Sequence, residues 1–327
     1  MRVIVTGGAG FLGSHLCDKL IEKGDQVICI DNLLTGNIEN ISHLQNSENF
    51  QFVEADATDA FPEDLDFDGL YHLASPASPN KNNPQSYMAL PFETMQVNSL
   101  GTWNLCEETL KRGAKFLYAS TSEVYGNPLE HPQKESYYGN VSTMGPRSVY
   151  DESKRFGETI TSAYVRYNKL NATMVRIFNT YGPRMARDGR VVIEFVMAAL
   201  QNKPFPVFGD GKQTRSFMFV SDLVDGLIAA MEKGTSGEAY NLGNPDEFTV
   251  LELAETVKRL TGASSEATLV EKLPADDPLR RCPDIQKARE KLGWEPKVNL
   301  EEGLKKLIIY LQTMGKPQDI IPDQNLQ

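Results

Sequence analysis

The sequence has few cysteines, no long apolar run and no excess of positive charge. Its four cysteines follow neither the spacing of a zinc site nor a disulfide pattern, so we expect reduced thiols in a cytoplasmic setting. No apolar run reaches the roughly 18 residues of a membrane helix, and a predicted strand that starts at Arg2 leaves no room for a signal peptide. The net charge of -11 argues against nucleic acid or an anionic membrane surface as a partner.

The 327 residues, 40% of them hydrophobic, suffice for one large or two ordinary domains with a sizeable core. Short apolar runs, typical of buried parallel strands, alternate with helical patterns through the N-terminal half. This alternation predicts an α/β fold with a Rossmann-type doubly wound parallel sheet. The predicted strands are residues 3–5, 26–31, 50–55, 69–74, a run that begins at 115, and 173–178.

The pattern changes after residue 179, where the predicted elements become shorter. A strand and turn rich in glycine and basic residues lies at 204–217, and helices follow. These elements predict a smaller α/β substrate-binding domain over the carboxyl edge of the sheet. The expected division is 1–180 for the cofactor domain, rejoined by about 217–242, then 181–315 for the substrate domain and 316–327 for a polar tail.

A glycine-rich turn follows the first strand. Gly7, Gly10 and Gly13 would allow a tight turn, close approach of a pyrophosphate, and close packing of the next helix, 14–24. The second predicted strand ends in Asp31, 18 positions after Gly13. An acidic residue there accepts both ribose hydroxyls of NAD and repels the 2′-phosphate of NADP. The full order of strand, turn, helix, strand and acid therefore predicts an NAD site.

The third and fourth strands end in polar residues at the same predicted edge. Asp56 would either meet the adenine or cap a turn, and the long loop at 75–91 lies where ligands bind in open parallel sheets. His72 stands within an apolar strand, so we expect it to be structural.

A predicted helix, 147–168, places Tyr150 and Lys154 one turn apart on the same face. A tyrosine with the usual pKa of about 10 is a poor base at neutral pH, and a neighbouring ammonium favours the phenolate. The hydroxyl of Thr121, at a strand end, would hold a substrate alcohol in line. Such a Tyr–Lys pair is common on helix surfaces, and the NAD site in the same chain is what favours a base for alcohol oxidation.

The glycine turn, Asp31, Thr121, Tyr150 and Lys154 together resemble the extended short-chain dehydrogenase/reductases, which modify nucleotide sugars. The resemblance covers nearly the whole chain and implies NAD as cofactor and a UDP-sugar as substrate. Within the family the chain is most similar to the UDP-glucuronate decarboxylases. The similarity rests on residues 72–79, 121–126, 139–141, 145–148, 150–152, 188–192 and 209–217.

Two other branches of the family differ at the residues after Thr121. The nucleotide-sugar 4,6-dehydratases carry Thr-Asp-Glu there, and their Asp is the acid that expels water. In this chain Ser122 stands at the position of that Asp, and it has no proton of suitable pKa to give. The 4-epimerases usually lack the carboxylate found at Glu123. The insertion at 80–86 and Val149 depart from typical decarboxylases. A non-catalytic NAD-binding protein would have lost part of the catalytic set, which is complete here.

The resemblance also implies roles for further residues. Glu123 would lie beside the departing carboxylate, where it either repels that group or positions a water or a proton. Arg215 is expected to bind the diphosphate, because a guanidinium is a reluctant acid. Arg280 or Arg281 is the other diphosphate candidate, and Phe208 lies either against the uracil or in the core. We expect no metal; the predicted substrate set is Ser122, Asn179, Arg190, Val191, Phe208, Arg215 and Arg280, and the cofactor set is Gly7, Gly10, Phe11, Leu12, Gly13, Asp31, Asn32, Asp56, Ala74, Tyr150 and Lys154.

The implied reaction is decarboxylation of UDP-glucuronate to UDP-xylose. Tyr150, helped by Lys154 and Thr121, would take the proton of the sugar 4-hydroxyl while the hydride goes to NAD, and the 4-keto acid would lose CO₂ before the hydride returns. The family also implies a homodimer through the predicted helices 96–112 and 147–168, with Met95, Leu100, Trp103 and Phe156 as apolar surface.

Overall fold

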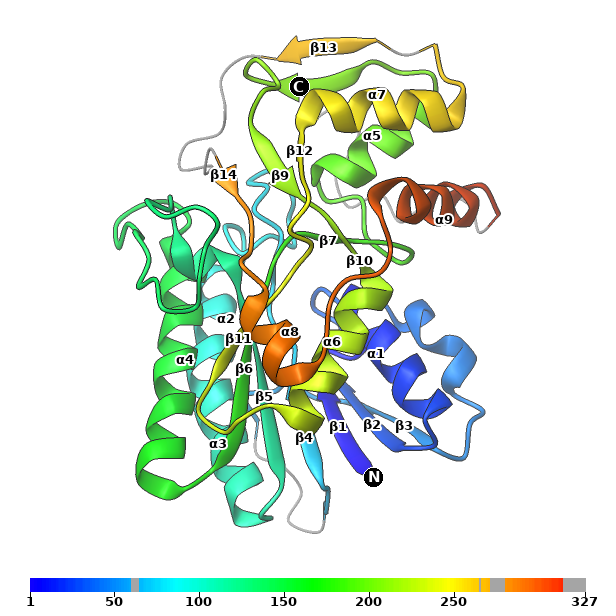
Figure 1. The fold of residues 1–327 in the computed structure, drawn as a ribbon. Helices are drawn as coiled ribbons and strands as arrows, with labels where there is room; N and C mark the ends of the chain where they lie inside the picture. The colour runs from blue at the N-terminus through cyan, green and yellow to red at the C-terminus, as the bar shows by residue number, and fades with distance from the viewer. Residues whose placement is uncertain (60–64, 265, 271–279, 314–327) are drawn as a thin grey trace.

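The computed structural model describes residues 1–59, 65–264, 266–270 and 280–313 (Figure 1). Its centre is a seven-stranded sheet in which every neighbouring pair is parallel, which confirms the predicted fold class. The order is β11-β6-β5-β4-β1-β2-β3, so the strand order reverses between β1 and β4. The strands are β1 (Arg2–Thr6), β2 (Gln26–Asp31), β3 (Phe50–Glu54), β4 (Gly69–His72), β5 (Lys115–Thr121), β6 (Asn171–Ile177) and β11 (Ala239–Leu242).

The strands are buried on both faces because successive side chains point to opposite sides of the sheet. In β1, Val3 and Val5 belong to one apolar cluster and Ile4 to another. In β5, Leu117 and Phe116 divide in the same way. These continuous apolar runs explain why the strands were predictable from the sequence.

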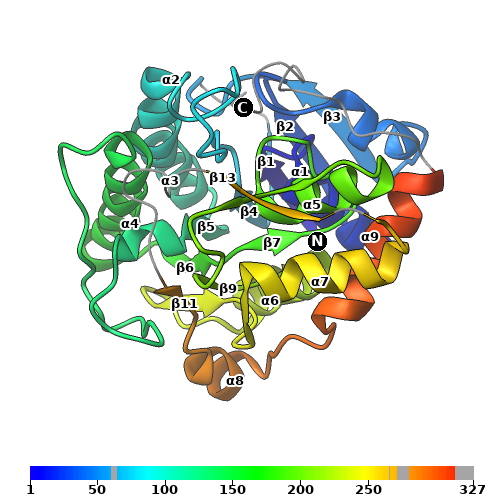
Figure 2. The ribbon, with the colours of Figure 1, turned by 90° about the horizontal axis from the view of Figure 1, so that it is seen from above.

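Helices cover the two faces of the sheet, as Figures 1 and 2 show. One face carries α1 (Phe11–Glu22) and α6 (Val220–Lys233), which contact each other. The other face carries α3 (Thr102–Lys111) and α4 (Ser148–Asn168), with α2 (Pro91–Gln96) beside α4.

Most of the remaining elements lie above the carboxyl ends of the main strands, whereas α8 lies beside β11 and α6 (Figure 1). They include the small sheets β10-β7, β12-β9-β14 and β13-β8. One apolar cluster continues from the face under α1 and α6 into α5, α7 and α9. The core is therefore shared between the two predicted domains, and their boundaries stay a prediction. The bounds are β7 (Thr180–Tyr181), α5 (Val191–Leu200), β8 (Phe205–Phe208), β9 (Thr214–Ser216), β10 (Met218–Phe219), β12 (Glu247–Thr249), α7 (Val250–Thr261), β13 (Ala267–Val270), β14 (Arg280–Arg281), α8 (Gln286–Leu292) and α9 (Leu300–Thr313).

Some predicted boundaries were wrong. The helix predicted at 96–112 begins at Pro91 and contains a π-helical turn, Val97–Gly101, before α3. Proline suits the first helical position, where its missing N–H costs no hydrogen bond. The helix predicted at 147–168 is α4, which begins one residue later at Ser148. The predicted tail, 316–327, lies outside the described residues.

None of the helices in the described part of the chain combines the length and apolarity that crossing a lipid bilayer requires.

Candidate active site

A cavity of about 840 Å³ lies at the carboxyl end of the sheet, where the strand order reverses. It is lined from the turns that follow β1, β2, β3 and β4. Nine of the residues predicted to bind the cofactor line it: Gly7, Gly10, Phe11, Leu12, Gly13, Asp31, Asn32, Asp56 and Ala74. The structure therefore brings together residues that are up to 67 positions apart in the chain, from Gly7 to Ala74.

The glycine turn has no room for side chains. Gly7 has a φ of 74°, and a Cβ atom there would lie 2.7 Å from the backbone nitrogen of Ala74. A Cβ atom at Gly13 would lie 2.1 Å from the carbonyl oxygen of Gly7. The turn leads directly into the N-terminus of α1, whose free amides favour a phosphate. This bare turn fits the pyrophosphate of NAD.

Asp31 is held in place by backbone amides at the end of β2. Its Oδ2 accepts a hydrogen bond from Ala9 N at 3.0 Å, and its Oδ1 accepts one from Leu33 N at 2.9 Å. Burial raises the pKa of Asp31, although these two amides oppose the shift. The carboxylate lines the cavity with its orientation already set, which fits a partner with two ribose hydroxyls.

Asp56 lines the same cavity and also caps a turn. Its Oδ1 accepts hydrogen bonds from the amide and the hydroxyl of Thr58, and its Oδ2 accepts one from Asn32 Nδ2 at 2.6 Å. Burial alone raises the pKa of Asp56, but these hydrogen bonds outweigh burial, so the pKa is lowered overall. Of the two interpretations of Asp56, the turn cap is therefore seen directly.

Tyr150, Lys154 and Thr121 lie together at the start of α4 and the end of β5. Thr121 is a polar neighbour that lowers the pKa of Tyr150, and Lys154 Nζ donates to Ala119 O at 2.8 Å. Lys154 Nζ lies 5.9 Å from the centre of the Tyr150 ring. The described lining of the large cavity does not include Tyr150, on whose ring Tyr87 is stacked.

Burial dominates the electrostatics of this pair. Burial raises the pKa of Tyr150, and Thr121 only partly offsets it. Burial also lowers the pKa of Lys154 to about 7, against the opposing charge of Glu158. Lys154 is not among the causes of the shift at Tyr150, so the expectation that its ammonium favours the phenolate stays a prediction.

Glu123 lies on a 3₁₀ turn directly after β5, with its carboxylate between two guanidiniums. Arg147 Nη2 is 2.6 Å from Oε2, and Arg281 contacts both carboxylate oxygens, with Nη2 at 2.8 Å from Oε2. Burial raises the pKa of Glu123, but the two arginines outweigh it and lower the pKa overall. The three groups carry a net positive charge, which favours the positioning role of Glu123 over repulsion of a substrate carboxylate.

The arginine doublet divides between two sides of a small sheet. Arg281 pairs with Arg215 across β14 and β9, whereas Arg280 pairs with Thr214 and is exposed. Residues in register on adjacent strands point to the same side, so Arg215 and Arg281 share a face. Arg281 contacts Glu123, and the choice between Arg280 and Arg281 for the diphosphate stays a prediction.

The other predicted substrate residues are dispersed around the same end of the sheet. Arg190 directly precedes α5, which starts at Val191. Arg190 lines the large cavity, and its guanidinium pairs with Asp188 at 2.9 Å. Ser122 is buried beside Glu123. Phe208 is 42% exposed, which excludes the core interpretation. Asn179 follows β6, and its carbonyl accepts a hydrogen bond from Met218 N.

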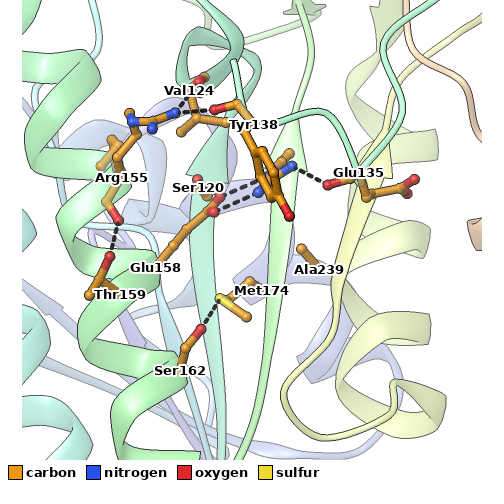
Figure 3. A network of polar contacts seen from close by, with 12 residues as sticks. Ser120, Val124, Glu135, Tyr138, Arg155, Glu158, Thr159, Ser162, Met174 and Ala239 are labelled. Carbon is orange, nitrogen blue, oxygen red and sulfur yellow. Dashed lines mark hydrogen bonds and ion pairs between the residues drawn. The ribbon is translucent and has the colours of Figure 1, made fainter. Parts of the chain in front are cut away.

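A partly buried ionic network lies between α4 and the adjoining strands β5 and β6, and the sequence did not indicate it (Figure 3). Glu158 of α4 accepts hydrogen bonds from Ser120 Oγ at 2.6 Å and from both Nε and Nη2 of Arg176. Arg176 Nη1 also donates to the Tyr125 hydroxyl and to the Glu135 carbonyl. This network connects the carboxyl end of β5, where Ser120 and Thr121 lie, to the loop before α4.

His72 is buried and its Nδ1 lies 2.8 Å from the Thr6 hydroxyl, as expected of a structural histidine. The four cysteines are buried and free. One grouping was not visible in the spacing of the cysteines: ligand atoms of His131, Glu247 and Cys282 lie within 4.8 Å of one another. His131 Nε2 and Glu247 Oε2 form a 2.8 Å hydrogen bond, which satisfies both groups without an ion.

Comparison with known proteins agrees with this geometry. A family profile described as GDP-mannose 4,6 dehydratase matches residues 4–307. The chain belongs to the extended short-chain dehydrogenase/reductases. The family consists of NAD-dependent enzymes, and the nine predicted residues that line the cavity fit that cofactor.

Relatives within the family point to one branch. The chain is 52% identical over 311 residues to UDP-glucuronic acid decarboxylase 1 of Arabidopsis thaliana, covering 94% of this chain and 69% of the relative. It is 47% identical over 312 residues to UDP-glucuronic acid decarboxylase 1 of Xenopus tropicalis, covering 95% and 72%. A solved structure of UDP-glucuronic acid 4-epimerase from Bacillus cereus, with UDP-glucuronic acid and NAD, has a TM-score of 0.83 at 28% identity and covers 96% of this chain and 100% of that one.

Proposed function

We propose that this chain decarboxylates UDP-glucuronate to UDP-xylose through a 4-keto intermediate, with NAD regenerated in each cycle. The observation that carries the proposal is the Glu123 carboxylate held by Arg147 and Arg281 beside the Thr121–Tyr150 pair. This arrangement presents positive charge near the position where a sugar carboxylate must lie. The named decarboxylases, about half identical over nearly all of this chain, support the same reaction.

The first step is removal of the sugar 4-hydroxyl proton by Tyr150. Thr121 is the polar neighbour that lowers the pKa of Tyr150, and its hydroxyl can also orient the sugar alcohol. Lys154, whose pKa burial lowers to about 7, is the group that compensates the phenolate when protonated. Bound NAD supplies the hydride acceptor for C4 and the same hydride for the return.

The second step is loss of CO₂. In a 4-keto uronic acid the ketone is β to the C6 carboxylate, so it accepts the electron pair of the breaking C5–C6 bond as an enolate. Arg147 and Arg281 hold Glu123 so that its charge is compensated, and Glu123 then orients a water molecule at C5 rather than giving up a proton itself. Ser122 lacks the acidity to expel water, which argues against a 4,6-dehydratase.

An NMR time course of the protein with UDP-glucuronate and catalytic NAD, followed at the sugar anomeric signals, tests this proposal. Conversion to UDP-xylose with no net reduction of NAD is the expected result. Accumulation of a 4-keto pentose would keep decarboxylation and show weak hydride return. An unchanged UDP-glucuronate signal, or one converted to the 4-epimer, would contradict the proposal, and dTDP-glucose and UDP-glucose would then be tested.

We propose also that the chain forms a homodimer through the outer surface of α3 and α4, which lie side by side (Figure 1). Leu100, Trp103 and Phe156 are about half exposed, at 52%, 49% and 51%, so they do not pack on the sheet. The apolar side chains on two neighbouring helices suit a four-helix interface.

The mass in solution at micromolar concentration tests the dimer, and the expected mass is twice that of the chain. Phe156→Glu should lower it to the monomer mass. Tyr167→Glu, at an exposed position near the end of α4, is the matched control and should stay dimeric. A monomeric wild-type chain would contradict this proposal.

The free cysteines support a reducing compartment, and we propose a cytoplasmic location. A fluorescent fusion of the full chain tests it, and a signal confined to another compartment would contradict it.

A further inference from the structure

The reaction proposed above consumes one proton from solvent in each turnover, and the inference drawn here depends on that reaction. When the C5–C6 bond breaks, CO₂ leaves, and C5 must receive H⁺ in its place. Tyr150 cannot supply that proton, because the proton it takes from the 4-hydroxyl returns to O4 when C4 regains the hydride. A proton must therefore travel from water to C5 by another route.

A separate cavity of about 290 Å³ reaches Glu123 from the side of the loop before α4. Its lining is strongly polar and includes Glu123, Arg147 and Asp151, together with Asn127, Asn140 and Ser148. A water molecule occupies about 30 Å³ of liquid, so the volume and the polar partners suit water. The cavity thus links solvent-side polar groups to the carboxylate at the catalytic strand end.

Asp151 is the one acidic side chain besides Glu123 in the described lining of this cavity. It follows Tyr150 on α4 and is only 6% exposed. Its Oδ1 is buried and has no hydrogen-bond partner among the described residues. A buried carboxylate oxygen without a partner is costly, so the site favours a proton or a water molecule on this atom.

Charged groups from several elements face Asp151. Burial and then the Glu123 carboxylate raise the pKa of Asp151 to about 7, while Arg147 and Arg281 oppose the shift and Glu152 on its own helix adds to it. The phenols of Tyr87 and Tyr150 also lie within its field. Asp151 is therefore divided between its acid and its carboxylate near neutral pH, as a proton carrier must be.

We propose that Asp151 and the water of this cavity deliver the C5 proton from solvent to the water molecule oriented by Glu123. Asp151 gives H⁺ to the cavity water and regains one from solvent, so the step needs no reactant besides water. Glu123 stays ionised between its two arginines and orients the last water of the path. Asp151 acts through the cavity water and the water that Glu123 orients, and it does not itself touch the sugar.

The test compares Asp151→Asn with wild type and with Glu152→Gln, an adjacent and more exposed carboxylate paired with Arg155. We expect Asp151→Asn to lower kcat roughly hundredfold or more with KM nearly unchanged. In a single turnover, the absorbance of reduced cofactor should appear at the wild-type rate and decay more slowly. The change of kcat with pH near pH 7 should be present in wild type and absent in Asp151→Asn. The solvent deuterium isotope effect on kcat should be larger in the variant.

The matched variants decide between transport of a proton and structural support. Asp151→Glu keeps an ionisable group and should restore the pH profile of kcat near pH 7, and Glu152→Gln should behave as wild type. If Asp151→Asn slows both phases equally, or changes neither the profile nor the isotope effect, the proposal is wrong. If wild type itself makes no UDP-xylose, the proposed function fails instead. Thermal melting and NAD titration of each variant show that it is folded, and should Asp151→Asn not fold, the isotope effect and profile of Asp151→Glu decide.

Discussion

Tyr87 lies flat on Tyr150, with the ring centroids 4.8 Å apart and an angle of 10° between the planes. Both rings are buried, and the Tyr87 hydroxyl has no hydrogen-bond partner among the described residues. Tyr87 comes from the long loop after β4, directly after residues 80–86. The loop therefore sets how far Tyr150 is removed from water, and so how high its pKa is.

Changing Tyr87 should separate the contribution of its ring from that of its hydroxyl. Tyr87→Phe keeps the stacked ring and removes an unpaired buried hydroxyl, so the free energy of unfolding should be unchanged or slightly higher. Tyr87→Ala leaves a cavity beside Tyr150 and should lower it by about 3–5 kcal/mol. Urea denaturation of the three proteins measures this, and an Ala variant as stable as wild type would refute the stacking as a packing contact.

Arg281→Gln should destabilise the protein most at neutral pH. The arginine lowers the pKa of Glu123, so its contribution is fully present above the ordinary carboxyl pKa and is lost as the pH falls through the lowered value. We expect a deficit of roughly 2–3 kcal/mol at pH 7 that shrinks in acid. Denaturation at several pH values measures it, with the exposed Arg280→Gln as control; equal deficits for both variants, or one independent of pH, would contradict the assignment.

NAD affinity should depend on the ionisation of Asp31. Burial raises the pKa of this carboxyl, so it takes up a proton at a higher pH than an ordinary aspartate, and a protonated carboxyl accepts ribose hydroxyls poorly. Affinity should be constant near neutral pH and fall in acid. Asp31→Asn should weaken binding roughly ten- to hundredfold and remove the acid dependence. Calorimetric titration checks this, and Asp56→Asn, a residue of the same cavity, should retain the pH dependence.

Tyr150→Phe should abolish turnover of UDP-glucuronate while NAD binding survives. General acid–base groups contribute roughly 10²- to 10⁴-fold, and phenylalanine keeps the ring that packs against Tyr87. Kinetics and NAD titration on one preparation measure both properties. Loss of both together would show that Tyr150 is structural and that its chemical role was misassigned.

Much of the fold and the cofactor site followed from local patterns. The strands of the sheet were predictable because a strand buried on both faces is a continuous apolar run, as in Val3–Val5. The glycines and Asp31 were recognisable because a tight turn and a strand end impose residue types at fixed spacing. Tyr150 and Lys154 were paired by helix periodicity alone. Boundaries were less certain, because the helix that begins at Pro91 passes through a π-helical turn that no periodic pattern marks.

Only the tertiary structure decided the electrostatics of the site. Glu123 and Arg281 are 158 residues apart, and no local pattern relates them. Arg176 and Glu158 meet because β6 and α4 pack together, and the cavity at Asp151 exists only where the loop before α4 folds over the strand end. Periodicity in the sequence determines which residues share a face of one element. Burial, which set the pKa values of Tyr150, Lys154 and Asp151, depends on what the rest of the chain places over them.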